Sequence, residues 1–166
     1  MTSYYSASGV VPPSTMRVDV PALTAPPAGG RQMLDMTGLG EEVIGARKSK
    51  SVDFAVHSHI FTRGLFNCFA VCAVWNKEGT TFKNGFLAHV SMANHSFFKA
   101  SLDNIPKDAF VACGVGPGEW GAQIAATLEE HVPSSNIWIY TRPNSDDYVG
   151  FGIDRSGRFG ETLGKG

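Results

Sequence analysis

The chain is poor in charged residues and has no run of basic ones. Charged residues make up 17% of its 166 residues, and the formal net charge is −1 at pH 7. A protein that binds nucleic acid through its phosphates normally carries a strongly basic surface. We therefore expect no nucleic-acid partner.

Long apolar runs are also missing. No uninterrupted apolar segment approaches the roughly 20 residues that a membrane-spanning helix needs. The first residues lack the basic start and apolar core of an ordinary secretory signal. We expect no membrane span, and a protein that is either cytoplasmic or exported into a host cell by a specialised secretion system.

Cysteine is scarce too, with only Cys68, Cys72 and Cys113. A small, odd number argues against a disulfide framework and leaves at least one thiol available for chemistry. Two nearby histidines, His57 and His59, have no third ligand at a suitable spacing, so a zinc site is not indicated. We expect neither a metal nor another cofactor.

Residues 1–50 differ in composition from the rest of the chain. Their prolines lie among Ser, Thr, Ala and Gly, and proline excludes a continuous helix or a central strand. We expect a flexible leader over 1–50, with one short ordered piece near Leu34–Ile44, and a catalytic domain over 51–166. Composition leaves open whether the leader is a disordered tail or an export signal.

The rest of the chain predicts strands, then one helix, then more strands. Apolar residues recur at helical spacing over 119–131, and short alternating or continuous apolar segments elsewhere are typical of strands. The expected strands cover 52–56, 69–75, 85–92, 108–113, 137–141, 148–154 and 158–162. The fold class is therefore α+β, with a largely antiparallel or mixed sheet and one main helix.

Two of these strands predict a hairpin that brings a cysteine to a histidine. In an antiparallel pair, opposed residue numbers add to a constant. A tight turn centred between Glu78 and Gly79 makes that constant 157 and sets Cys68 opposite His89. A longer turn would slip the register by two residues. On spacing alone, a buried cysteine near a hydrogen-bonded core histidine is the favoured interpretation.

A catalytic pair is the alternative. A free thiol has a pKa of about 8.5 and is only a few per cent ionised at neutral pH. An adjacent imidazole takes its proton and later donates that proton to a leaving amine. Backbone N–H groups near Gly64–Asn67 are candidates for stabilising the oxyanion.

The segment Thr62–Cys72 reads T-R-G-L-F-N-C-F-A-V-C, and Ala88-His89-Val90 follows after the hairpin turn. This pattern resembles the T-x-G-L-G-S-C-V-A-V signature and A-H-V-like strand of the CheD family of chemoreceptor glutamine deamidases. Cysteine-dependent deamidase toxins share a similar Cys–His core. The resemblance is close over Thr62–Cys72 and loose over Asp53–Glu161.

The resemblance implies a layered α/β/β fold and three catalytic roles. Cys68 falls on the nucleophile, His89 on the general base, and Thr62 on the residue that positions the histidine. The implied activity is hydrolysis of a glutamine side-chain amide in a protein substrate, with release of ammonia.

Two positions depart from the family pattern. Phe66-Asn67 replaces Gly-Ser before the nucleophile, and Ser91-Met92 replaces Leu-Pro after the base. We expect the bulky Phe66 to reshape or cover the pocket. These departures favour a diverged deamidase, such as an effector that acts on a host protein. They leave open a cysteine peptidase, a transglutaminase-like acyl transferase, and a non-catalytic adaptor domain.

Overall fold

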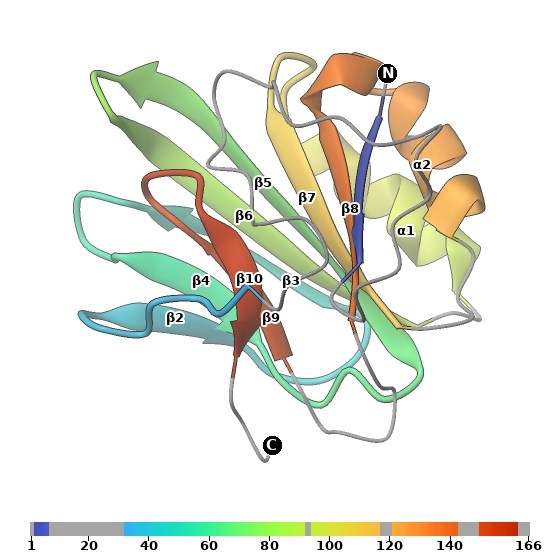
Figure 1. Ribbon diagram of the computed structural model, residues 1–166, viewed down its shortest axis with the longest axis horizontal. Helices are drawn as coiled ribbons and strands as arrows, with labels where there is room; N and C mark the ends of the chain where they lie inside the picture. Colours follow the sequence, from blue (N-terminus) through green and yellow to red (C-terminus); the bar gives the residue numbers. More distant parts are fainter. Residues whose placement is uncertain (1, 7–31, 92–93, 117–120, 143–149, 163–166) are drawn as a thin grey trace.

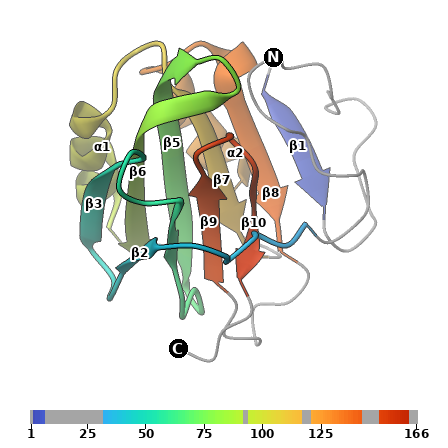
Figure 2. The ribbon, with the colours of Figure 1, turned by 90° about the vertical axis from the view of Figure 1, so that its left-hand side faces the viewer.

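Two β-sheets pack face to face, and two α-helices cover the outer face of the larger sheet (Figures 1 and 2). The computed structural model describes residues 2–6, 32–91, 94–116, 121–142 and 150–162. Their arrangement is an α/β/β sandwich, so the α+β class expected from the sequence is confirmed.

The larger sheet has six strands in the order β1-β8-β7-β5-β6-β3. Its strands are β1 (Ser3–Ser6), β3 (Lys48–Asp53), β5 (Cys68–Glu78), β6 (Thr81–Ser91), β7 (Phe110–Val115) and β8 (Ile137–Thr141). The pairings β3–β6, β5–β6 and β5–β7 are antiparallel, whereas β8 runs parallel to both β7 and β1. The sheet is therefore mixed.

The smaller sheet has four strands in the order β10-β9-β4-β2. Its strands are β2 (Gly40–Val43), β4 (His59–Thr62), β9 (Gly150–Asp154) and β10 (Phe159–Thr162). β2 and β4 pair in parallel, and the other pairs are antiparallel. The hairpin β9–β10 turns at Gly157, whose φ of +85° suits glycine.

Two short α-helices pack on the larger sheet. α2 (Gly121–Glu129) lies within the expected helix, and Ile124 and Leu128 are buried on its inner face. α1 (His95–Ser101) was not expected, because seven residues are too few to show a helical repeat. Its start is capped by Asn94, whose side chain accepts a 2.9 Å hydrogen bond from the Phe97 N–H. Within the described ranges, no helix is long and apolar enough to cross a membrane.

The start of the folded domain differs from the boundary expected at residue 51. β1 lies along the edge of the larger sheet, where Tyr5 stacks on Trp138 with ring centroids 5.0 Å apart. β2 and the start of β3 also precede residue 51. The described parts of 1–50 thus belong to the fold, because distant partners order strands that local composition does not reveal. Residue 1 and residues 7–31 lie outside the described part of the chain.

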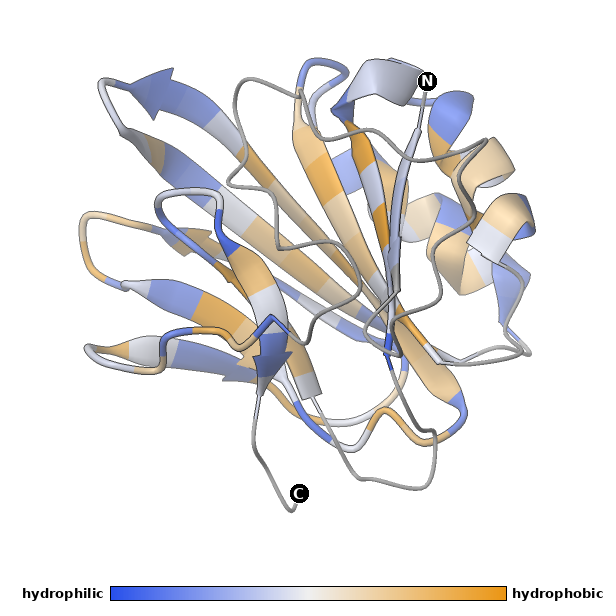
Figure 3. Cartoon of the chain, viewed as in Figure 1, coloured by the Kyte–Doolittle hydropathy of each residue, from blue (hydrophilic) through white to orange (hydrophobic). Residues whose placement is uncertain are grey.

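Alternation along the strands divides the core into two layers. On β5, Ala70, Cys72 and Val74 face the smaller sheet, whereas Val71 and Ala73 face the helices. Figure 3 shows hydrophobic residues concentrated along β5, β7 and β8, with hydrophilic residues at the far end of the β5–β6 hairpin. By the same alternation, every second residue of β5 and β6 projects between the two sheets.

Candidate active site

The β5–β6 hairpin carries the expected nucleophile and base on one face, in a register two residues away from the tight-turn prediction. Cys68 lies opposite Ser91, and His89 lies opposite Ala70. A shift of one residue would turn the histidine to the other face, but a shift of two preserves the face. Cys68 and His89 are therefore diagonal neighbours in the space between the sheets.

The turn explains the shift. Glu78 pairs with Thr81, so the loop consists of Gly79 and Thr80. Gly79 has a φ of +62°, as required at the first central position of a type II′ hairpin turn. Diagonal residues of an antiparallel pair lie about 7–8 Å apart, with their side chains closer, so long side chains still meet.

Thr62 reaches His89 from the smaller sheet. Its Oγ1 lies 2.7 Å from His89 Nδ1 and 2.6 Å from the Val43 carbonyl oxygen. A carbonyl oxygen only accepts, and the hydroxyl has a single hydrogen, so Thr62 donates to Val43. It must then accept from Nδ1–H of His89. In this arrangement the neutral imidazole keeps the lone pair of Nε2 available as a base.

Close packing of three strands holds Thr62 in place. The residue ends β4, is fully buried, and lies in register with Val43 on β2 and with Phe151 on β9. A Cβ atom on Gly150 would collide with the Thr62 carbonyl oxygen, so only glycine permits β9 to approach this closely. Thr62 is thus fixed by the packing of the smaller sheet.

The environment of His89 favours the neutral imidazole. The residue is only 3% exposed, and its carbonyl oxygen accepts a 2.8 Å hydrogen bond from the Arg47 N–H. Burial lowers the pKa of His89, and the positive charge of Arg142 lowers it further. His89 therefore remains an unprotonated base to a lower pH than an ordinary histidine, whose pKa is about 6.5.

The three cysteines occupy different environments. Cys68 is half-buried at the start of β5, whereas Cys72 and Cys113 are fully buried. Burial raises the pKa of both buried thiols, and for Cys72 the proximity of Cys113 adds to the effect. None of the three, all of which the structure describes, is in a disulfide. Cys68 is thus the thiol best suited to nucleophilic chemistry.

Arg142 also lies at this site, and no pattern in the sequence predicted it there. It follows β8 directly, is fully buried, and donates through Nη2 to the Cys68 carbonyl oxygen over 3.2 Å. An arginine that ends an apolar strand is ordinarily expected at the surface, so the sequence carries no signal for its burial.

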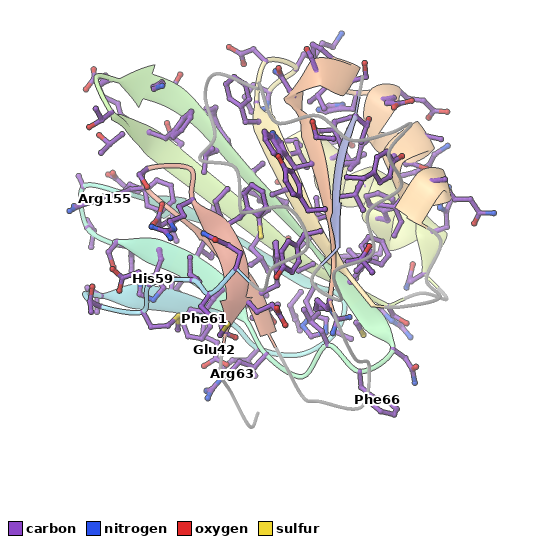
Figure 4. All side chains as sticks on the ribbon, viewed as in Figure 1. Glu42, His59, Phe61, Arg63, Phe66 and Arg155 are labelled. Atoms are coloured by element: carbon purple, nitrogen blue, oxygen red, sulfur yellow. The ribbon has the colours of Figure 1, made fainter. Side chains whose placement is uncertain are left out.

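Phe66 lies at the rim of the site. Its side chain is 43% exposed, and Figure 4 shows it at the lower edge of the molecule, pointing away from the sheets. Along the same edge, Arg63 Nε and Nη2 donate to the two carboxylate oxygens of Glu42 over 2.8 and 2.9 Å. The expectation that Phe66 reshapes or covers the pocket stays a prediction.

The backbone near Gly64–Asn67 and the histidines His57 and His59 have hydrogen-bond or ion-pair partners outside this site. The Phe66 N–H, within the segment expected to stabilise an oxyanion, donates instead to the Gly64 carbonyl oxygen over 2.8 Å. At the opposite end of β4 from Thr62, Ser58 Oγ lies 2.8 Å from His59 Nδ1. His57 pairs with Glu41 over 3.2 Å. These histidines are therefore separate from the Cys68 site.

The structure thus gathers a thiol, an imidazole, a hydroxyl and a guanidinium at one end of the space between the sheets. These groups can support attack by sulfur on a carbonyl or carboxamide carbon. In comparisons with known proteins, no protein-family model and no curated protein matches the chain.

Proposed function

We propose that the chain is a cysteine-dependent deamidase that converts glutamine to glutamate in a protein substrate. The observation that carries this proposal is the 2.7 Å contact between Thr62 Oγ1 and His89 Nδ1. It joins two of the three residues that the sequence resemblance implies, Thr62 and His89. It also leaves Nε2 of His89 available to act as a base. Cys68 supplies the nucleophile from the same face of the hairpin.

The proposed reaction has two halves. His89 Nε2 takes the proton of the Cys68 thiol, and the sulfur attacks the carboxamide carbon of the substrate glutamine. The carbon–nitrogen bond then breaks, and ammonia leaves with a proton donated by His89. Water hydrolyses the resulting thioester, with His89 again accepting a proton, which yields glutamate and regenerates the thiol.

Exposed apolar residues at the rim favour a protein as the substrate. Ile44 follows Val43, the hydrogen-bond partner of Thr62, and is 72% exposed. Phe66 is exposed two residues before the nucleophile. Apolar side chains beside a reactive centre provide contact area for residues that flank a substrate glutamine.

The experiment is an ammonia-release assay on an unfolded, glutamine-rich protein, with mass spectrometry of the product. Cys68→Ala should abolish ammonia release because the thioester cannot form. The matched control is Cys72→Ala, which removes a buried thiol from the same strand face and should remain active.

Each outcome has a distinct meaning. Conversion of carboxamide to carboxylate in an intact chain supports a deamidase. Chain cleavage would indicate a peptidase, and amine adducts an acyl transferase. Full ammonia release by Cys68→Ala would contradict the assignment of the nucleophile.

A further inference from the structure

We propose that Arg142 is a positioning residue of this site, which holds the start of β5 and supplies the positive charge that stabilises the Cys68 thiolate. Its effect on the rate of deamidation rests on the proposed function. Its effect on the thiol can be measured without any substrate.

The strand register places Arg142 on the reactive face. Tyr140, Gly114 and Ala70 lie in one row across β8, β7 and β5. Cys68 begins β5 and Arg142 directly follows β8, and each lies two residues from this row, towards the same end of the sheet. Because side chains alternate, both project into the space between the sheets, as Tyr140 and Ala70 do.

Two contacts anchor the arginine there. Its backbone N–H donates to the Val115 carbonyl oxygen over 2.7 Å, and Nη2 donates to the Cys68 carbonyl oxygen over 3.2 Å. Together they connect the ends of β7, β8 and β5. The second contact fixes the backbone of the nucleophile itself and brings a permanent cation beside it.

The charge has opposite effects on the two catalytic groups. An arginine stays protonated even when buried, and little water is present to screen it. It therefore favours a thiolate on Cys68 and disfavours an imidazolium on His89, in agreement with the lowered pKa of His89. In many cysteine enzymes the imidazolium is the counter-charge of the thiolate. Here the guanidinium shares that part: the thiolate forms when His89 takes the thiol proton, and the imidazolium, with its lowered pKa, readily gives that proton to the leaving ammonia.

Several other charged groups lie on the surrounding strands. Glu42 is paired with Arg63, and Glu161 accepts a 2.9 Å hydrogen bond from the Tyr140 hydroxyl. Two exposed cations lie beside His89, namely Arg47 just before β3 and Lys48 at its start. Arg142 differs from them because it is fully buried and donates to the backbone carbonyl oxygen of Cys68.

Alkylation of the full-length protein by iodoacetamide tests this role, with peptide mapping to follow Cys68. At pH 7, Arg142→Gln should slow labelling of Cys68 by about tenfold or more, whereas Arg142→Lys should label at close to the wild-type rate. His89→Gln should slow labelling less than Arg142→Gln, because the counter-charge remains. The rate profile should move to higher pH in Arg142→Gln.

Rates measured across pH decide between the alternatives. Wild-type labelling of a folded Arg142→Gln protein would overturn the role of Arg142, as would a larger effect of His89→Gln. Rapid labelling of all three cysteines identifies a variant that has not folded. In that case Arg142→Lys tests the role of the charge. Labelling of Cys68 at a near-wild-type rate supports the proposal, and labelling that is tenfold slower overturns it. Absence of deamidation in the wild-type protein would contradict the proposed function and leave this measurement intact.

Discussion

The space between the two sheets has a polar end and an apolar middle, built from the same strands. Cys68 and Cys72 lie on the same face of β5, and His89 and Leu87 lie on the same face of β6. In the middle, Cys72 and Leu87 are fully buried among apolar side chains. At the end, Cys68 is half-buried and His89 is hydrogen-bonded. Because side chains alternate along a strand, residues of both kinds project into this space, and their local partners decide whether they are hydrogen-bonded or packed in the apolar core.

The two regions should therefore respond differently to mutation. A buried polar group stabilises the fold little, because its hydrogen bonds replace those it made to water. A buried aliphatic side chain stabilises the fold through its removal from water and its close packing. Substitutions at the polar end should reduce activity, and those in the middle should reduce stability.

The largest effect on activity, after loss of the nucleophile, is expected at His89. His89→Gln preserves side-chain size but removes the base, and should lower kcat/KM for ammonia release by about 10²–10⁴-fold. In the wild-type protein, the proposed deamidase activity should persist below pH 6.5, because burial and Arg142 lower the pKa of His89. Unchanged ammonia release in His89→Gln would show that the polar end of the space between the sheets is no more important for activity than the apolar middle.

Thr62 should have the next largest effect. Thr62→Val keeps the shape but removes the acceptor for Nδ1–H, so the ring can adopt the unproductive tautomer. We expect kcat/KM to fall by about tenfold or more, which is less than the loss expected when the base itself is removed. Thr62→Ser retains the hydroxyl and is the matched control. Equal losses in the valine and serine variants would show that packing, rather than the hydrogen bond, is responsible.

Substitution of Leu87, in the apolar middle, should lower stability and should have the smallest effect on activity. Leu87 is fully buried two residues before His89, on the same face of β6. Leu87→Ala should lower the free energy of unfolding by about 2–5 kcal/mol. Urea denaturation gives this value, and kcat/KM measured well below the unfolding transition should stay near that of the wild type. A large loss of activity in the folded variant would show that the two regions are coupled.

The sequence predicted much of the architecture behind this comparison. The strands β5 to β8, the helix α2 and the closing hairpin β9–β10 lie where apolar patterns and turn residues indicated. The predicted register of β5–β6 was wrong by two residues. The turn is centred between Gly79 and Thr80, because a type II′ turn needs the positive φ of Gly79 at its first central position. The edge strand β1 was missed, since its partner β8 lies far away in the chain.

The sequence by itself determined that Cys68 and His89 share a face, because side chains alternate along a strand and a shift of two residues preserves that face. The resemblance to the glutamine deamidases also predicted that Thr62 positions His89. Only the tertiary structure decided which nitrogen of His89 is free, because Val43 takes the single hydrogen of the Thr62 hydroxyl. Likewise, only the alignment of β8, β7 and β5 buries Arg142 against Cys68. Pairings between distant strands set these contacts, and local patterns in the sequence do not encode them.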